Sequence, residues 1–209
     1  RPLGDDIQNM KHSAPGSVSL IKTINTIGQE IKAGGNRRVA LMGILDVNHP
    51  ELFNFLTVKL DKKQLNNFNI SVAITDRFIE ACEGDEEWYF TYNNKKYFIF
   101  DVETEGTVHT IGAHDEEDAR GRVREHLLMN PASEMVVTQR KVMAKDIWRK
   151  IWTSAVECGC PGIFNISRTN SYNCINYFEY LPGTNPCGEI PLPSYGNCCL
   201  GHVNLDQML

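Results

Sequence analysis

Short apolar segments of strand length alternate with segments of helical periodicity along this chain of 209 residues. Residues 38–45 and 68–74 are mostly apolar runs, and each is followed by a segment in which apolar residues recur at helical spacing. Strands that are apolar throughout are typical of a parallel sheet whose faces are covered by helices. The alternation therefore predicts an α/β fold, with a further strand at 162–167.

The helices are predicted from apolar stripes and terminal residues, and are expected at 18–31, 49–59, 75–82 and 144–159. The first carries an apolar stripe formed by Val18, Leu20, Ile21, Ile24, Ile27 and Ile31. We expect Gly34-Gly35 to stop this helix. Asp46 and Asn48 are good caps for the second helix, and Thr75 for the third. The last should bury the face formed by Ile147, Trp148, Ile151, Trp152 and Ala155.

Residues 97–141 follow another pattern. Strand-like segments come first, then a run that is acidic at its start and basic later, DEEDARGRVREHLL, and then EMVVTQRKV. That distribution of charge suits a helix dipole. The order strand, strand, helix, strand predicts a small α+β unit. We interpret its charge run as a solvated helix face, with a regulatory or partner-binding role as the alternative, and we expect its three histidines to be surface residues: His109, His114 and His126.

The charge balance excludes several classes of partner. The formal net charge is −5 and 22% of the residues are charged, which is ordinary for an acidic soluble protein. No basic patch of the kind that binds a nucleic-acid backbone is present. No apolar run approaches the length of a membrane span, and the first residues lack a secretory pattern. We therefore expect neither nucleic acid nor a membrane as partner.

The seven cysteines indicate a reducing compartment. An odd number outside a small secreted scaffold argues against a disulfide framework. No C-x-x-C pair is present, and the closely spaced cysteines are poorly placed for zinc. We expect no bound metal and a cytoplasmic protein with one or two working thiols. The remaining cysteines are interpreted as small buried hydrophobic residues: Cys82, Cys158, Cys160 and Cys174.

A thiol between a carboxamide and a carboxylate lies near the end of the chain, in the run Asn185-Pro186-Cys187-Gly188-Glu189. On an extended loop, side chains at i, i+2 and i+4 point to the same side. We therefore expect Asn185, Cys187 and Glu189 to face one substrate together. The combination offers a sulfur for nucleophilic or one-electron chemistry, a neutral hydrogen-bonding group and a base. A later cysteine could supply reducing equivalents.

The segment NPCGEIPLPSYGNCCLGHVNL resembles the active-site finger loop of ribonucleotide reductase catalytic chains, most closely those of the adenosylcobalamin-dependent type. Other stretches resemble the same family, in the family's order: RPLGDDIQ, GSVSLIKTINTIGQEIKAGGNRR, MGILDVNHPELFNFLTVK, NNFNISVAITDRFIEA and WRKIWTSAVECGCPGIFNISRTN. One short motif would be a weak signal, whereas several in order are specific. Residues 97–141 depart from the family pattern.

The resemblance implies part of a ten-stranded α/β barrel with the cysteine-bearing finger loop threaded through its centre. It divides the chain into a barrel segment at 1–96 with an effector-loop-like start, a small α+β insertion at 97–141, and a barrel segment with the finger loop at 142–209. Catalytic chains of the family are several times longer, so we expect an internal piece of a larger polypeptide.

The resemblance also implies the reduction of ribonucleotides to deoxyribonucleotides through a thiyl radical. Cys187 would abstract the 3′ hydrogen, Glu189 would accept the 3′-hydroxyl proton, and Asn185 would hold the ribose hydroxyls. Cys198 would be one of two redox cysteines, with its partner on an upstream strand, and would form a disulfide. Cys199 is expected to be a bystander, although it could exchange disulfides with Cys198. Whether the substrate is a diphosphate or a triphosphate stays open.

The start of the chain, RPLGDDIQ, resembles the loop that binds a deoxynucleotide or ATP effector at the dimer interface of the family. Arg1 would contact phosphate, and Ile7 would pack near the effector. Gln8 stands where the family often has a basic residue, and Lys11 could compensate. Residues 60–67 lie where the family's specificity loop would be. An ordinary surface turn is the alternative interpretation of RPLGDDIQ.

The implied cofactors and partners are adenosylcobalamin, a dithiol reductant such as thioredoxin, the effector nucleotide, and a second copy of the complete chain in a homodimer. Two alternatives stay open. One is the large subunit of a two-subunit reductase that takes its radical from a diiron or dimanganese subunit. The other is a non-catalytic remnant or binding module that keeps the barrel sequence.

Overall fold

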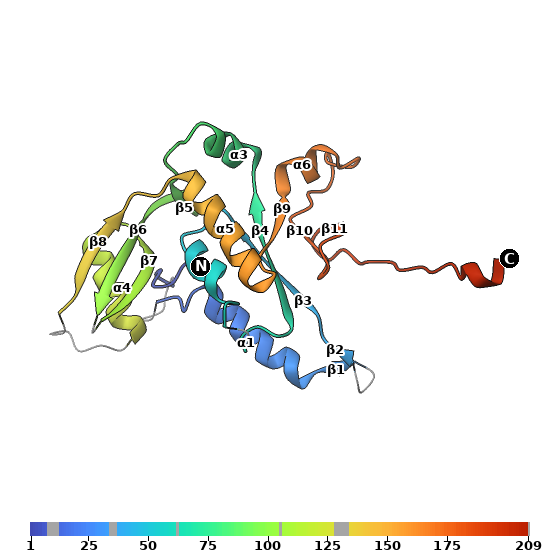
Figure 1. Cartoon of the computed structure of the whole chain (residues 1–209), viewed down its shortest axis with the longest axis horizontal. Helices are drawn as coiled ribbons and strands as arrows, with labels where there is room; N and C mark the ends of the chain where they lie inside the picture. Colours follow the sequence, from blue (N-terminus) through green and yellow to red (C-terminus); the bar gives the residue numbers. More distant parts are fainter. Residues whose placement is uncertain (8–12, 34–36, 62, 105, 128–133, 209) are drawn as a thin grey trace.

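The computed structural model describes residues 1–7, 13–33, 37–61, 63–104, 106–127 and 134–208. A parallel sheet lies at its centre, an antiparallel sheet with its own helix lies to one side, and the last residues extend away from the body (Figure 1). Gly34, Gly35, Gln8 and Lys11, to which the sequence assigned roles, lie outside the described residues.

The central sheet contains three parallel strands in the order β3 (Leu41–Asp46), β4 (Phe68–Ile74) and β9 (Gly162–Asn165). All but one residue of β4 are buried, as expected for a strand that helices cover. The predicted mixed α/β class is therefore confirmed. Within the described residues the three strands form an open sheet and do not close into a barrel. Residues 38–40 do not belong to β3, because Arg37–Arg38 (β2) pairs with Lys32–Ala33 (β1) in a separate small hairpin.

Buried apolar side chains of three helices share the main hydrophobic core with the central sheet: α2 (Leu52–Thr57), α3 (Asp76–Glu83) and α5 (Ala144–Cys158). Ile147 and Ile151 of α5 are buried in the main core, as predicted from their spacing. Trp148 packs against the edge of this core, but Trp152 is 52% exposed, which corrects its expected burial. The helix ends at Gly159, whose φ of +73° is favourable for glycine.

The helix caps are only partly as predicted. Thr75 caps α3, because its hydroxyl accepts a hydrogen bond from the Phe78 amide at 3.2 Å. Asp46 and Asn48 do not cap α2, which begins at Leu52 without a side-chain cap. The Asp46 carboxylate instead accepts hydrogen bonds from the backbone and side-chain nitrogens of Asn48 at 2.7 and 2.8 Å. A local turn at the end of β3 thus uses both residues.

Helix α1 (Ser17–Glu30) packs through a face that its apolar stripe did not predict. Its buried residues are Asn25 and Gly28. Asn25 accepts a hydrogen bond from the Asn67 amide at 3.0 Å, and a Cβ on Gly28 would lie only 3.3 Å from Leu41. Val18 and Ile21 contact the core, but the rest of the stripe is exposed: Leu20, Ile24, Ile27 and Ile31. The helix therefore presents an apolar face to its surroundings.

The second sheet is antiparallel and contains β5 (Phe90–Tyr92), β6 (Lys95–Thr104), β7 (Thr107–Ala113) and β8 (Val136–Arg140). Helix α4 (Glu116–Leu127) packs on it, so β6, β7, α4 and β8 follow the expected order of strand, strand, helix, strand. A small core of its own joins helix and sheet, formed by Phe100, Val102, Ile111, Ala113, Ala119, Val123 and Met135. The boundary expected after residue 96 falls inside β6, and the division into three domains stays a prediction.

The C-terminal part contains α6 (Ile166–Ser171), the short strands β10 (Gly183–Thr184) and β11 (Pro191–Leu192), and a 3-10 helix, η1 (Leu205–Met208). Beyond β11 the chain runs out from the body as an extended tail (Figure 1). None of the described helices is long and apolar enough to cross a bilayer.

Candidate functional site

The predicted catalytic residues lie on the tip of a hairpin. Strands β10 and β11 pair as Gly183 with Leu192 and Thr184 with Pro191. The tip is closed by hydrogen bonds from the Asn185 amide to the Ile190 carbonyl at 3.1 Å and from the Gly188 amide to the Asn185 carbonyl at 3.0 Å. These bonds make residues 185–190 a tight turn, which corrects the expected extended loop.

The turn brings the carboxamide and the carboxylate together. The Nδ2 group of Asn185 donates a hydrogen bond to Oε1 of Glu189 at 2.7 Å, and Oδ1 of Asn185 accepts one from the Ile190 amide at 3.1 Å. Asn185 is buried, whereas Cys187 is exposed between the two. Gly188 has φ +85°, a conformation that glycine adopts without strain. The sulfur is therefore exposed at the tip of the turn, two residues in sequence from each member of a hydrogen-bonded Asn–Glu pair.

The hairpin is fastened to the central sheet by a residue that the sequence did not single out. Asn69, at the start of β4, donates a hydrogen bond from Nδ2 to the Pro186 carbonyl at 2.7 Å. On the other side, a Cβ on Gly183 would lie 3.3 Å from Ile44 of β3. Asn69 and Pro186 are 117 residues apart, and no local pattern signals such a contact. The central sheet therefore positions the cysteine-bearing turn.

The structure does not bring Cys198 to this turn. Cys198 is half-exposed in the extended tail, and Cys199 beside it is exposed. All seven cysteines are free thiols. Burial raises the pKa of the Cys82 thiol, in agreement with a structural role. Cys82, Cys158 and Cys160 are only half-buried and Cys174 is exposed, which corrects the expected burial of all four.

The described part of the effector-like start is an ordered loop. The Gly4 amide donates to the Ala14 carbonyl at 2.9 Å, and the Ala14 amide donates to the Asp5 carbonyl at 2.7 Å. The Arg1 guanidinium is exposed and donates to the Asp6 carbonyl at 2.6 Å, while Ile7 is half-buried. Both arms of the loop therefore meet at its base.

A cluster of half-buried Ser17 with buried His49 and Glu51 joins the start of α1 to the segment before α2. Nδ1 of His49 accepts a hydrogen bond from the Glu51 amide at 3.2 Å, so the ring proton is assigned to Nε2, 3.4 Å from the Ser17 hydroxyl. That hydroxyl donates to the Glu51 carboxylate at 2.6 Å, and the same carboxylate accepts from the Ser17 amide. The imidazole has no lone pair toward Ser17 and cannot activate it as a general base. The cluster instead fastens the N-terminus of α1.

Protonation of His49 is expected to destabilise the fold. Burial lowers the pKa of His49 from 6.5 to about 4. Between these two pH values the imidazole is protonated in the unfolded chain but stays neutral in the folded chain. The free energy of unfolding should fall by up to about 3 kcal/mol between pH 6.5 and 4. Glu51 acts in the opposite direction, because burial raises the pKa of its carboxyl group. Its contribution to the free energy of unfolding is lost as the pH rises through this raised pKa.

Urea denaturation at a series of pH values measures this effect. His49→Gln should flatten the acid limb of the pH profile, whereas the exposed His126→Gln should leave it unchanged. Equal acid limbs in wild type and His49→Gln would contradict the assignment of the destabilisation to His49.

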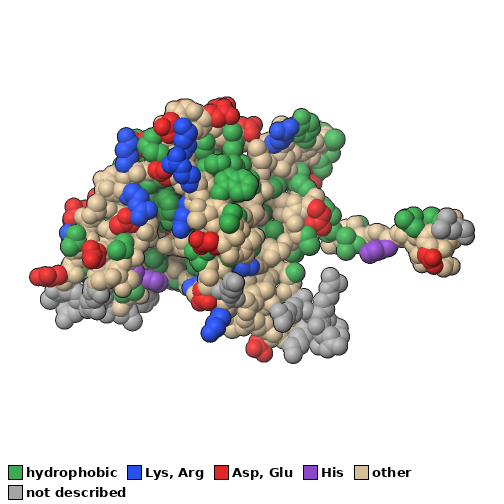
Figure 2. Space-filling model, in the orientation of Figure 1, with side chains coloured by type: hydrophobic (Ala, Val, Ile, Leu, Met, Phe, Trp, Pro, Cys, Tyr) green, Lys and Arg blue, Asp and Glu red, His purple; other side chains and the backbone are tan. Residues whose placement is uncertain are grey.

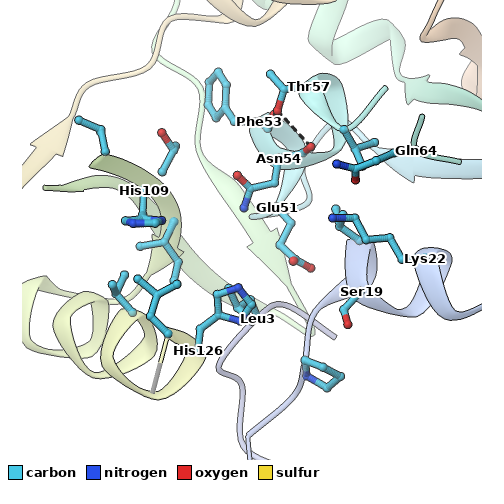
Figure 3. A pocket seen from close by; sticks show the side chains of 18 of the residues that line it. Leu3, Ser19, Lys22, Glu51, Phe53, Asn54, Thr57, Gln64, His109 and His126 are labelled. Carbon is cyan, nitrogen blue, oxygen red and sulfur yellow. Dashed lines mark hydrogen bonds between the residues drawn. The ribbon is translucent and has the colours of Figure 1, made fainter. Parts of the chain in front are cut away.

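A cleft of about 680 Å³ separates α1 and α2 from β7 and α4 (Figure 3). Ser19, Lys22, Glu51, Phe53 and Asn54 lie on one wall and Leu3, His109 and His126 on the other. Asp61 and Gln64, from the segment expected at the specificity loop, also line it. The hairpin of β10 and β11, which carries Cys187, does not contribute residues to this cleft. In the described residues, no group of three or more His, Cys, Asp or Glu side chains is placed to hold a metal ion.

Comparison with known proteins identifies the family. The family model "Ribonucleotide reductase, barrel domain" matches residues 1–209. The chain therefore belongs to the ribonucleotide reductase barrel-domain family, which confirms the resemblance seen in its motifs.

Several curated relatives carry related names. The chain is 31% identical over 208 residues to the vitamin B12-dependent ribonucleoside-diphosphate reductase of Thermoplasma acidophilum, covering 99% of this chain and 22% of that protein. It is 30% identical over 210 residues to the protein of the same name from Mycobacterium tuberculosis, covering 100% of this chain and 25% of the relative. A putative ribonucleoside-diphosphate reductase large subunit of Frog virus 3 is 21% identical over 214 residues. The chain thus spans about a quarter of the length of the first two relatives.

The residues around Cys187 do not by themselves form a site for the cofactor in the relatives' names. Cys187 is exposed at the hairpin tip and lies outside the cleft described above. The groups fixed beside it, Asn185 and Glu189, are hydrogen-bonded to each other and suit the polar edge of a small substrate.

Proposed function

We propose that this chain is the part of a ribonucleotide reductase catalytic chain that carries the reacting thiol, and that the complete chain reduces ribonucleotides to deoxyribonucleotides for DNA synthesis. One observation carries the proposal: an exposed cysteine on a hairpin tip, backed by a carboxamide and a carboxylate joined at 2.7 Å. The family match supports it. In the complete chain, β3, β4 and β9 would be strands of a ten-stranded barrel around this hairpin.

The proposed chemistry begins with a thiyl radical on Cys187, which takes the hydrogen atom from C3′ of the ribose and becomes a thiol. Glu189 accepts the proton of the 3′ hydroxyl, and the 2′ hydroxyl takes up a proton and leaves as water, so that the step neither gains nor loses a proton overall. Asn185 orients the ribose hydroxyls, since its amide is already fixed by the turn. A dithiol then supplies two electrons and two protons and becomes a disulfide, and Cys187 returns its hydrogen atom to C3′.

Cys198 is proposed as one thiol of that dithiol, paired with a cysteine of the complete chain that precedes these residues. In this role the extended tail would have to fold back toward Cys187. The free thiol of Cys198 and its half-exposed position support access by a reductant such as thioredoxin.

Cys198→Ser is expected to allow hydrogen abstraction from the substrate to begin but to block deoxyribonucleotide formation, because the dithiol that supplies two electrons to the intermediate is missing. Rapid-quench measurement of product over the first turnovers, followed by the steady state, tests this in the complete chain. Cys199→Ser is the matched control and should sustain turnover. Sustained turnover by Cys198→Ser would transfer the role to another cysteine.

The radical source is proposed to be adenosylcobalamin, in line with the relatives named vitamin B12-dependent. Product formation by the complete chain should be assayed with a dithiol, with and without adenosylcobalamin, on both ribonucleoside di- and triphosphates. Product only with the cofactor would support this class. Product only after addition of a metal-radical subunit would identify the two-subunit class, and no product under either condition would support a non-catalytic remnant.

The remaining proposals concern regulation and assembly. The loop at Arg1–Ile7 is proposed to bind a deoxynucleotide or ATP effector, with Gln8 and Lys11 as further contacts. The exposed apolar residues Leu20, Ile24 and Ile27 of α1 support a homodimer of the complete chain through this helix. A cytoplasmic location is proposed, because all seven cysteines are free.

A further inference from the structure

A buried arginine connects the second sheet to the start of the chain. Arg122 of α4 is 5% exposed. Its guanidinium donates to the Leu3 carbonyl at 2.6 Å, to Asp5 Oδ1 at 3.1 Å and to Asp118 Oδ1 at 2.8 Å. Only the last of these partners belongs to its own helix. A buried guanidinium that loses partners is costly, so the position of α4 and the conformation of residues 3–5 depend on each other.

A second donor contacts the same carboxylate oxygen of Asp5. The hydroxyl of Tyr97, in β6, donates a hydrogen bond to Asp5 Oδ1 at 2.7 Å. Tyr97 is 1% exposed and belongs to the main hydrophobic core. The guanidinium of Arg122 lies 5.5 Å from the centre of the Tyr97 ring. Asp5 therefore accepts one hydrogen bond from a charged donor on α4 and one from a neutral donor on β6.

The backbone at this point fits the arginine closely. Gly4 has φ +79°, and a Cβ added to it would lie 2.4 Å from Cγ of Arg122. On the other arm of the loop, the Ser13 amide donates to the Glu125 carboxylate of α4 at 3.3 Å. Both described arms of the loop thus contact the same helix, and Leu3 lies beside α4 at the edge of the cleft in Figure 3.

We propose that Arg122 is a positioning residue for the N-terminal loop, and that through it the unit of β6, β7, α4 and β8 sets the response of this loop to a nucleotide effector. The proposal rests on the effector role proposed above. A nucleotide that requires another loop conformation must either move α4 or separate Arg122 from Asp5. The energetic coupling is reciprocal, so the position of α4 also changes the affinity of the loop for that nucleotide.

Hydrogen exchange of the complete chain tests the positioning role directly. The reporters are the amides of Gly4 and Ala14, whose hydrogen bonds close the loop. Arg122→Lys keeps the positive charge but cannot donate to Leu3, Asp5 and Asp118 at the same time in the geometry of a guanidinium. It should accelerate hydrogen exchange of both amides about tenfold, while the exchange rates of the α5 amides stay unchanged. Asp5→Asn should act in the same direction. Tyr97→Phe is the milder variant, since it removes only the hydroxyl.

Arg120→Lys is the matched control, because Arg120 lies on the same helix and its guanidinium donates to Glu116 and to the Met135 carbonyl, away from the loop. Its exchange pattern should match wild type. Unchanged exchange at Gly4 and Ala14 in Arg122→Lys, Asp5→Asn and Tyr97→Phe would overturn the positioning role.

The regulatory part is measured with dATP and dTTP as probes. The concentration that gives a half-maximal change in substrate preference should rise about tenfold in Arg122→Lys and stay unchanged in Arg120→Lys. Faster exchange with an unaltered nucleotide response would overturn the coupling. A wild-type chain that responds to no nucleotide would refute the effector role and the coupling with it, while the exchange rates would still decide whether Arg122 positions the loop.

Discussion

Cys187→Ala is expected to lower deoxyribonucleotide formation by the complete chain to the background of the assay, a loss of more than about 10⁴-fold. Hydrogen-atom abstraction needs the sulfur itself, and the other groups fixed at the hairpin tip are a carboxamide and a carboxylate. The side chain is exposed and forms no hydrogen bond that closes the turn, so the fold should be unaffected. Product formation and thermal unfolding of the variant test both statements.

Cys174→Ala provides the comparison for this variant, because Cys174 is also an exposed free thiol in the C-terminal part. It should retain full activity. Nucleotide binding by Cys187→Ala, measured by equilibrium dialysis, should stay within about twofold of wild type, since the sulfur contacts only the reacting hydrogen. Turnover by Cys187→Ala above background would remove this residue from the radical role.

Glu189→Gln is expected to lower the rate of the chemical step by about 10²- to 10⁴-fold, because an amide cannot accept the 3′-hydroxyl proton. The substitution preserves size, and its carbonyl oxygen can still accept the hydrogen bond that Asn185 now donates at 2.7 Å. The turn should therefore stay folded, which separates loss of the base from loss of structure. The measurement is single-turnover product formation at saturating substrate, as a function of pH.

Glu179→Gln tests whether loss of another negative charge in the C-terminal part has the same effect, and it should be neutral. Asn185→Ala should differ from both, because it removes the partner of Glu189 and of the Ile190 amide and so loosens the turn itself. We expect Asn185→Ala to lower both the rate and the protection of the Ile190 amide from hydrogen exchange. A Glu189→Gln enzyme with wild-type single-turnover rates would exclude Glu189 as the base.

The local elements were largely predictable from the sequence. β4 occupies residues 68–74 as its apolar run indicated, Thr75 caps α3, and α5 begins at Ala144. Each of these depends on the periodicity of neighbouring side chains or on one short-range hydrogen bond. The order of elements after residue 95 was predictable for the same reason.

Burial was less predictable than periodicity. The apolar stripe of α1 was expected to be the buried face, but the helix packs through Asn25 and Gly28. The reason is a contact with Asn67, whose amide needs the Asn25 carbonyl group and whose side chain approaches Gly28. Trp152 of α5 was expected to be buried for the same reason, but it is exposed. The spacing of apolar residues along a helix does not reveal whether another element lies opposite each of them.

The sequence by itself determined the family, the mixed α/β class and the chemical types in the NPCGE run, because these are properties of residue order. Only the tertiary structure decided that the run is a tight turn, that Asn185 is buried against Glu189 while Cys187 is exposed, and that Asn69 holds the hairpin from 117 residues away. It also brought Arg122 and Tyr97 onto Asp5. Such contacts depend on where the folded backbone places residues that are distant in the chain, and no local pattern of side chains encodes that distance.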